Sequence, residues 1–244
     1  MAGNANYMKS EIAIKILDLV RRNYEEIAVD FDLTRQKEIW PELKNLAASV
    51  RDGDRVLDAG CGNGRLLNAL SGKKIDYLGV DNNVELLELA AKNHPGFHFV
   101  RSDLLSLAEI PADNFTHIFC LAVLQHIPSR ELRLRVLRGL KSKLAANGQI
   151  VLSVWNLWSA VKGREKYHRL IIKTGLASLF GLNPYGRLDF GDLIFPWKNS
   201  RGAAVSLRYY HAFTSGELRR LARAVGLRIV WEKREDFNYW LILK

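Results

Sequence analysis

The sequence contains few cysteines. Cys61 and Cys120 are its only two, they lie far apart, and neither has a partner in a C-x-x-C pattern. This excludes a disulfide framework and a cysteine-based structural zinc site, so we expect no metal and a reducing, cytoplasmic location. Long apolar runs are also missing, and the first residues show no basic-then-apolar signal, so we expect no membrane contact.

Acidic residues are outnumbered. The 244 residues include 36 Lys and Arg but only 26 Asp and Glu, which gives a net charge of +10. Such an excess favours an anionic partner, and nucleic acid is the commonest one for a cytoplasmic protein. Solubility alone is the alternative interpretation. The length and the 48% of apolar residues predict a single domain with a full core.

What the chain does have is a glycine-rich corner at residues 55–64, RVLDAGCGNG. Val56 and Leu57 predict a buried strand, which ends at Asp58, and residues 65–71 have helical composition. Strand, glycine turn and helix together form a nucleotide-binding corner, because glycines let the backbone approach a ligand and the first helical N–H groups point at it. We expect Asp58 to hold the turn by accepting backbone N–H bonds.

The spacing of the glycines narrows the choice of ligand. A dinucleotide site has G-x-G-x-x-G, but here the third glycine comes one residue early, giving D-x-G-x-G-x-G. This pattern resembles motif I of the class I S-adenosylmethionine (SAM) methyltransferases. The next strand, at 76–80, leads to Asp81, which is placed to bind both ribose hydroxyls of SAM. The predicted cofactor-binding residues are Asp58, Gly60, Cys61, Gly62, Asn63, Gly64, Asp81, Asn82, Asp103, Leu104 and Leu121.

Strands and helices alternate along the core. Strands are expected at 55–58, 76–80, 97–101, 115–120, 148–154, 227–232 and 237–243, and helices at 8–22, 65–71, 83–93, 129–145 and 217–224, with Asn147-Gly148 as a turn. The alternation implies a parallel sheet with right-handed crossovers, and the last two strands should pair antiparallel. The expected fold is therefore α/β: a Rossmann-like, seven-stranded, mostly parallel sheet with a terminal antiparallel hairpin, as in class I methyltransferases.

We divide this single domain into four segments. Residues 1–50 form an N-terminal helical lid and 51–155 the SAM-binding core. Residues 156–206 interrupt the alternation with aromatic and basic residues, and are interpreted as a substrate lid rather than a surface elaboration. Residues 207–244 supply the last helix and the hairpin.

Three further residues follow strands at the edge where the ligand should lie. Asp103 is placed to bind the adenine amino group or to cap a helix. His126 lies in the loop nearest the transferred methyl group, and Trp155 ends the fifth strand. The helix from Ser129 also carries six basic residues against one acid, which allows a surface that faces RNA or a merely solvated face. The six are Arg130, Arg133, Arg135, Arg138, Lys141 and Lys143.

Several signatures resemble the tRNA wobble-uridine carboxymethyl methyltransferases. They run from about residue 23 to the C-terminus: Tyr24-x-x-Ile27-Ala28-x-x-Phe31-x-x-Thr34-Arg35 before Trp40-Pro41, the glycine motif, residues 122–126, Phe195-Pro196-Trp197, Arg208-Tyr209-Tyr210-His211 with Gly216-Glu217-Leu218, and Tyr239-Trp240. The resemblance implies methylation of the carboxylate of 5-carboxymethyluridine in tRNA, with SAM as cofactor. It implies that Arg35, His126, Trp155, Tyr210 and His211 surround the cofactor tail and the modified base.

The resemblance also implies partners. These are tRNA, bound at its anticodon loop, and a small zinc-containing activator protein of the kind that eukaryotic members use. A carboxylate nucleophile is ionised at neutral pH and needs no general base. Two other functions remain open on the sequence: a SAM-dependent methyltransferase of a quinone or metabolite, which would share the core motifs, and a non-catalytic SAM- or RNA-binding module.

Overall fold

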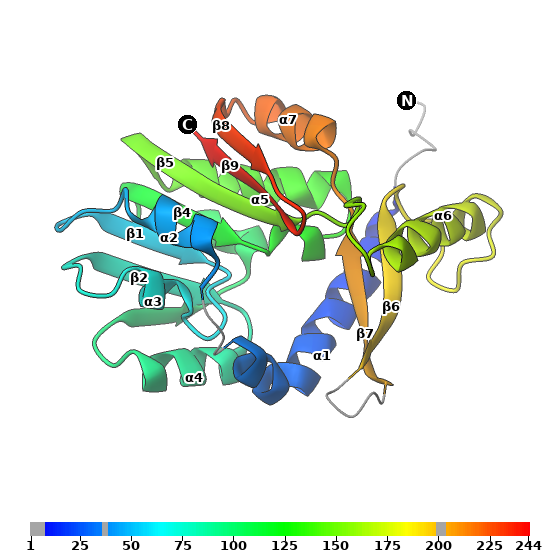
Figure 1. Cartoon of the computed structure of the whole chain (residues 1–244), viewed down its shortest axis with the longest axis horizontal. Helices are drawn as coiled ribbons and strands as arrows, with labels where there is room; N and C mark the ends of the chain where they lie inside the picture. Colours follow the sequence, from blue (N-terminus) through cyan, green and yellow to red (C-terminus); the bar gives the residue numbers. More distant parts are fainter. Residues whose placement is uncertain (1–7, 36–38, 199–203) are drawn as a thin grey trace.

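The computed structural model describes residues 8–35, 39–198 and 204–244. Within these ranges the core is one seven-stranded sheet (Figure 1) with the order β3-β2-β1-β4-β5-β9-β8. Its strands are β1 (Arg55–Ala59), β2 (Asp76–Asp81), β3 (His98–Arg101), β4 (Phe115–Leu121), β5 (Leu144–Trp155), β8 (Ile229–Arg234) and β9 (Asn238–Leu243). Strands β1 to β5 pair in parallel, and β9 pairs antiparallel with both β5 and β8. The expected fold class is confirmed.

Alternating side chains give the sheet two apolar faces. On one face Val56 and Trp240 pack with α2 (Pro41–Ala47) and α3 (Leu66–Ala69). On the other, Leu57 and Leu152 pack with α5 (Arg130–Ser142), α7 (Ser215–Ala224) and the short 3-10 helix η1 (Leu104–Glu109). Helix α4 (Val84–Asn93) connects β2 to β3 and contacts both strands. Burial on both faces explains why apolar residues follow one another in these strands, as Val56-Leu57 do in β1 and residues 118–121 do in β4, rather than alternating with polar ones.

One local expectation is wrong. Asn147-Gly148 is not a turn between a helix and a strand, because β5 already begins at Leu144 and runs through both residues. The pairing of β4 with β5 changes register at this place, and a Cβ on Gly148 would lie 2.7 Å from the carbonyl oxygen of Phe115. Glycine is therefore needed for the close approach of two strands at a bulge.

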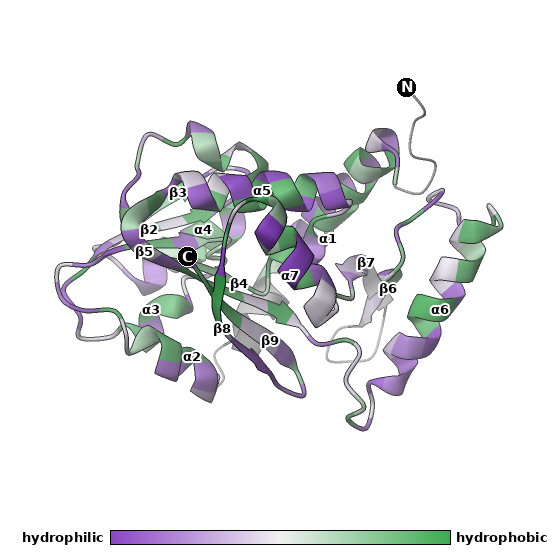
Figure 2. Ribbon diagram, turned by 90° about the horizontal axis from the view of Figure 1, so that it is seen from above, coloured by the Kyte–Doolittle hydropathy of each residue, from purple (hydrophilic) through white to green (hydrophobic). Residues whose placement is uncertain are grey.

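A second unit lies against the core at its far right in Figure 1. The strands β6 (Asp192–Lys198) and β7 (Ala204–His211) form an antiparallel ribbon. On one face of it, α1 (Ser10–Arg35) packs Ile16 against Tyr209. On the other face, α6 (Glu165–Leu179) packs Ile171 with Leu193. Figure 2 shows α6 at the opposite end of the molecule from α3 and β3, with hydrophobic and hydrophilic residues alternating along it.

The amphipathic helix expected over residues 8–22 is present but continues to Arg35 as α1. Its apolar residues Ile12, Ile16 and Leu19 share one cluster, as their spacing predicted. The ribbon was not anticipated as a sheet, and position 206, where the inserted segment was expected to end, lies inside β7.

Candidate active site

A cavity of about 390 Å³ opens at the carboxyl ends of β1, β2 and β4. This is within the range of about 300–1,000 Å³ that ligand pockets span. Its walls come from α1, the glycine turn, the end of β2 and the loop after β4. The predicted residues that line it are Asp58, Gly60, Cys61, Gly62, Asn63, Asp81, Asn82, Asp103, Leu104, Leu121, His126 and Trp155.

The glycine turn has the conformation that requires glycine. Gly60, Gly62 and Gly64 have φ values of 80°, 53° and 78°. A Cβ on Gly60 would lie 2.5 Å from the side chain of Val123, in the loop after β4. A Cβ on Gly64 would lie 3.0 Å from the ring of His94, at the end of α4. Gly60 therefore lets two ligand-facing loops meet, whereas Gly64 lets the turn pack against a helix and does not line the cavity.

Asp81 holds this turn. Its carboxylate accepts the backbone N–H of Gly62 at 2.9 Å and that of Asn83 at 3.0 Å. The N–H groups of Gly60 and Cys61 donate to the carbonyl of Val80 instead. Asp58, which we expected to accept such bonds, accepts the hydroxyl of Tyr77 at 2.9 Å. The strand-end acid of β2, rather than that of β1, therefore fixes the backbone at the ligand-facing corner.

The electrostatics of this corner favour a cationic ligand. Burial raises the pKa of Asp58 to about 7, although the Tyr77 hydrogen bond opposes the rise and the charge of Asp81 adds to it. Burial also raises the pKa of Asp81, against the hydrogen bonds from backbone N–H groups, and it raises the pKa of the Cys61 thiol. Both acidic side chains line one cavity, and neither forms an ion pair with a basic side chain among the described residues, so a positively charged cofactor suits this corner. The site therefore fits SAM.

The third acid, Asp103, has two roles open to it. Its side chain accepts the N–H of Leu105 at 2.8 Å and so caps η1, as the alternative interpretation expected. It also lines the cavity, beside Leu104. Because a carboxylate has two oxygens with several lone pairs, capping one N–H leaves acceptor sites for an adenine amino group.

The loop that carries His126 begins and ends at residues in the left-handed conformation. Ala122 has φ 53° and Ser129 φ 58°, and neither is glycine. Such positions cost about 1–3 kcal/mol each and persist only where the surroundings enforce them. Ala122 is held by its N–H bond to the carbonyl of Ser153, and Ser129 caps α5 by accepting the N–H of Leu132. The segment between these two residues places His126 at the cavity.

Helix α1, which belongs to the segment expected to be an N-terminal lid, supplies one wall of the cavity through residues that were not predicted individually. The hydroxyl of Tyr24 lies 2.9 Å from Nε2 of His126, and both side chains line the cavity. Arg21 and Asp18 of the same helix also line it, as does Trp40. In the sequence, the polar residues of α1 opposite its apolar stripe recur at helical spacing. That pattern alone does not show which of them face the cofactor site.

The other three residues predicted near the substrate are Tyr210, Arg35 and His211, and none of them is among the described side chains that line the cavity. Tyr210 does not line the cavity, but its ring packs 4.8 Å from that of His126 and 4.9 Å from that of Trp155, which do. Arg35 is the last residue of α1, and its side chain lies outside the described residues. His211 is buried behind this wall and belongs to a different cluster.

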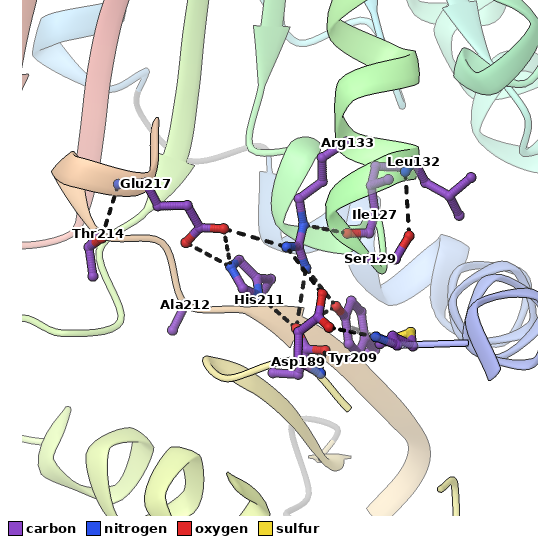
Figure 3. A network of polar contacts seen from close by, with 12 residues as sticks. Ile127, Ser129, Leu132, Arg133, Asp189, Tyr209, His211, Ala212, Thr214 and Glu217 are labelled. Atoms are coloured by element: carbon purple, nitrogen blue, oxygen red, sulfur yellow. Dashed lines mark hydrogen bonds and ion pairs between the residues drawn. The ribbon is translucent and has the colours of Figure 1, made fainter. Parts of the chain in front are cut away.

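This cluster is a buried ion network around Arg133 (Figure 3). Arg133, 1% exposed, pairs with Asp192 at 3.2 Å, with Glu217 at 3.5 Å and with Asp189 at 4.0 Å. His211 Nδ1 lies 2.6 Å from Asp192, and its Nε2 lies 2.9 Å from Glu217. Because both ring nitrogens face carboxylates, both act as donors and the ring is an imidazolium.

The pKa of His211 agrees with that geometry. Burial and the charge of Arg133 lower it, but the hydrogen bonds to Asp192 and Glu217 outweigh them, so the pKa lies above its usual value. The hydroxyl of Tyr209 also donates to Asp192, at 2.7 Å. The network therefore joins α5, the ribbon and the start of α7.

For Arg133, the interpretation that the basic helix faces RNA is wrong. Its side chain is buried, donates through Nε to the carbonyl of Ile127, and cannot face RNA. Arg135, Lys141 and Lys143 also donate to backbone carbonyls of neighbouring segments. Arg130, Arg135, Arg138 and Lys141 are exposed, so an anionic partner can still reach this part of the helix. Four of the six basic residues thus tie this helix to neighbouring segments, and Arg133 ties it to the His126 loop.

Across residues 8–35, 39–198 and 204–244, no three His, Cys, Asp or Glu side chains gather as they would around a metal ion. In the same ranges, none of the helices combines the length and apolarity needed to cross a bilayer.

The sequence and the fold are both similar to known proteins. A family model described as "Methyltransferase domain" matches residues 31–232. The tRNA (carboxymethyluridine(34)-5-O)-methyltransferase of Saccharomyces cerevisiae is 26% identical, over 96% of this chain and 98% of the yeast protein. The protein of the same name from Schizosaccharomyces pombe is 25% identical, over 92% of this chain and 95% of its own length.

Among solved structures, a chain from a complex between the Haloferax volcanii Trm112 methyltransferase activator and a methyltransferase superposes with a TM-score of 0.61. It is 15% identical, over 92% of this chain and 96% of that chain. At this identity the similarity establishes the fold.

Proposed function

Since the chain belongs to the methyltransferase-domain family and is a SAM-dependent methyltransferase, we propose that it methylates the carboxylate of 5-carboxymethyluridine at the tRNA wobble position. The observation that carries this proposal is the match to two fungal proteins named for that reaction, which extends over nearly the whole of each chain. The net charge of +10 supports it, because tRNA is a polyanion.

The residues of the cavity suit this chemistry. Asp81 accepts the ribose hydroxyls, Asp103 the adenine amino group, and Leu104 and Leu121 form the apolar walls. When bound, SAM supplies a methyl group on a positively charged sulfur, which an ionised carboxylate attacks without losing a proton. The site therefore needs orientation and exclusion of water rather than a general base. His126 and Trp155 form the wall that orients the nucleoside.

Arg35 is proposed to orient the substrate carboxylate, because its planar guanidinium can bind a carboxylate through two parallel hydrogen bonds. The substitution Arg35→Lys keeps the charge and loses that geometry. It is expected to lower turnover while SAM affinity changes little. A parallel loss of SAM affinity would assign Arg35 to the methionine carboxylate instead.

The decisive experiment is incubation with labelled SAM and bulk tRNA, followed by nucleoside mass spectrometry. The methyl ester of 5-carboxymethyluridine is the expected product. Label in a small-molecule fraction but not in tRNA would point to a metabolite methyltransferase. SAM binding without any labelled product, even with an activator protein present, would leave only a binding module.

A small zinc-containing activator protein is proposed as a partner, by the same resemblance and by the Haloferax volcanii complex that shares the fold. Assays of the chain alone and after co-purification with such a protein test this. Equal turnover in both would exclude an activator requirement.

A further inference from the structure

One face of the β6–β7 ribbon carries an aromatic strip that leads away from the cavity. Side chains alternate across a strand, and the register pairs Phe195 with Arg208 and Trp197 with Ser206. Phe195, Trp197, Arg208 and Tyr210 therefore lie on the same face, which α6 covers in part where Tyr167 packs against Phe195. We call these four residues the ribbon strip.

The strip begins at the wall of the active site. The ring of Tyr210 lies 4.9 Å from that of Trp155, which lines the cavity, and 5.3 Å from that of Phe195. Arg208 donates through Nη1 to the Tyr210 hydroxyl at 3.1 Å. Its guanidinium lies 5.0 Å from the centre of the Trp197 ring, farther along the ribbon. The contacts are continuous from the cavity to the outer end of the ribbon.

Arg208 has binding capacity that the fold does not use. Its Nε is shielded from solvent and has no hydrogen-bond partner among the residues that the structure describes. Within those residues no carboxylate forms an ion pair with it, in contrast to Arg133. Leaving a buried donor unsatisfied costs about 1–3 kcal/mol, so this N–H, on an arginine bonded to the Tyr210 that packs against the cavity wall, indicates an acceptor that arrives with the ligand.

We propose that the ribbon strip binds unpaired bases of the RNA that flank the nucleoside in the cavity. The inference rests on the proposed function. Unstacked bases are bound by aromatic rings and guanidinium planes, and a base carbonyl or a phosphate oxygen satisfies a free N–H of arginine. The half-buried indole of Trp197 provides the ring, and Arg208 provides both the plane and the donor.

The test measures RNA binding and SAM binding on the same variants. The RNA is a labelled anticodon stem-loop with 5-carboxymethyluridine at the wobble position, and its Kd is read from fluorescence anisotropy. Trp197→Ala should weaken RNA binding about tenfold, while Trp197→Phe should keep most of it because a ring remains. Arg208→Lys keeps the charge and loses the plane, and should weaken binding about fivefold. SAM affinity should stay within twofold in all three.

The chain offers matched controls. Trp231 lies on β8, at the far edge of the main sheet, and is likewise half buried. Arg223 carries the same charge on the exposed side of α7. Trp231→Ala and Arg223→Ala should each change RNA affinity by less than twofold. RNA affinity of Trp197→Ala equal to that of the wild type, in a folded protein that binds SAM, overturns the inference.

Failure of the proposed function would be distinguishable. If the wild-type protein does not methylate the stem-loop, the same variants are measured with an unmodified single-stranded oligouridylate. A loss of binding on Trp197→Ala then still supports the ribbon strip as a base-binding site. Equal binding by all variants, or no binding by the wild type, overturns it.

Discussion

Two buried groups of acidic residues in this molecule are stabilised in different ways, one by hydrogen bonds alone and the other by ion pairs. At the glycine corner, Asp58 and Asp81 face a cavity and are stabilised by a tyrosine hydroxyl and backbone N–H groups. In the ion network, Asp192 and Glu217 are paired with Arg133 and with the imidazolium of His211. The first group has raised pKa values and no ion pair with a basic side chain among the described residues, whereas the second has its cations built in. The acids of the cofactor site are therefore held by hydrogen bonds alone, in contrast to those of the network.

The two groups also differ in how the chain brings them together. The polar groups of the corner come from the ends of two adjacent parallel strands, and Tyr77 lies 19 positions from Asp58. Arg133 reaches Asp192 and Tyr209 across 59 and 76 positions. A site assembled locally can be read from spacing, while a site assembled over long range needs the tertiary structure.

The largest expected effect is on the network. Arg133→Leu leaves the buried carboxylates of Asp192 and Glu217 without their main cation, and should lower the free energy of unfolding by about 3–5 kcal/mol. Urea unfolding followed by circular dichroism measures this. Arg138→Leu, on the exposed side of the same helix, is the matched control and should change it by less than about 0.5 kcal/mol. Equal midpoints for the two variants would show that the network contributes nothing to stability.

The next effect is a pH dependence at the corner. Folding raises the pKa of Asp58 from 3.8 to about 7, so between these pH values the folded protein holds a proton that the unfolded chain releases. The stability from this group is complete below about pH 4 and is lost as pH rises to 7, by about 2 kcal/mol between pH 5 and 7. Asp58→Asn should remove this part of the pH dependence of urea unfolding in the cofactor-free protein. Parallel pH profiles for the variant and the wild type would contradict the assignment.

The sequence predicted the corner well because each of its signals is local. Asp58, the three glycines and Asp81 occur at fixed spacing around two strand ends, and parallel strands bring their carboxyl ends to one edge. The β/α alternation similarly predicted the sheet and its terminal hairpin. The prediction of a turn at Asn147-Gly148 was wrong because an Asn-Gly pair occurs at bulges as well as at turns. Only the close approach of Gly148 to Phe115 decides between them.

The network and the ribbon could not be predicted in the same way. Arg133 sits in a run of basic residues that looks like a solvated helix face, and two of its acidic partners, Asp189 and Asp192, occur in a segment without clear periodicity. His211 was placed beside the substrate with Tyr210 because the family resemblance, which includes the signature Arg208-Tyr209-Tyr210-His211, implies it. Since successive side chains of a strand point to opposite faces, Tyr210 packs toward the cavity and His211 points away from it.

A smaller effect is expected when the side chain that binds the ribose of SAM loses its charge and the glycine turn keeps its shape. Asp81→Asn keeps one oxygen to accept the N–H of Gly62 or Asn83, but removes the charge that binds the ribose hydroxyls. SAM affinity measured by calorimetric titration should fall by about 1.5 kcal/mol, roughly tenfold. Asp76→Asn, at the exposed start of the same strand, should leave SAM affinity unchanged. Unchanged affinity in a folded Asp81→Asn protein would remove Asp81 from the site.

The smallest effect tests where the two regions meet, at the His126 loop. Arg133 holds this loop from behind through the carbonyl of Ile127, and Tyr24 contacts His126 from the cavity side. Tyr24→Phe removes only the hydroxyl that lies 2.9 Å from Nε2, so the ring of His126 should keep its place but lose a restraint on its orientation. One neutral hydrogen bond is worth about 1 kcal/mol, so kcat/KM for RNA should fall about fivefold while the urea midpoint stays within error.

Tyr185→Phe, in the cluster between α1 and the ribbon, is the matched loss of a hydroxyl and should leave kcat/KM unchanged. If Tyr24→Phe instead lowers stability and leaves kcat/KM intact, the contact is a structural link, and the orientation of His126 is set by its other contacts, among them the ring of Tyr210.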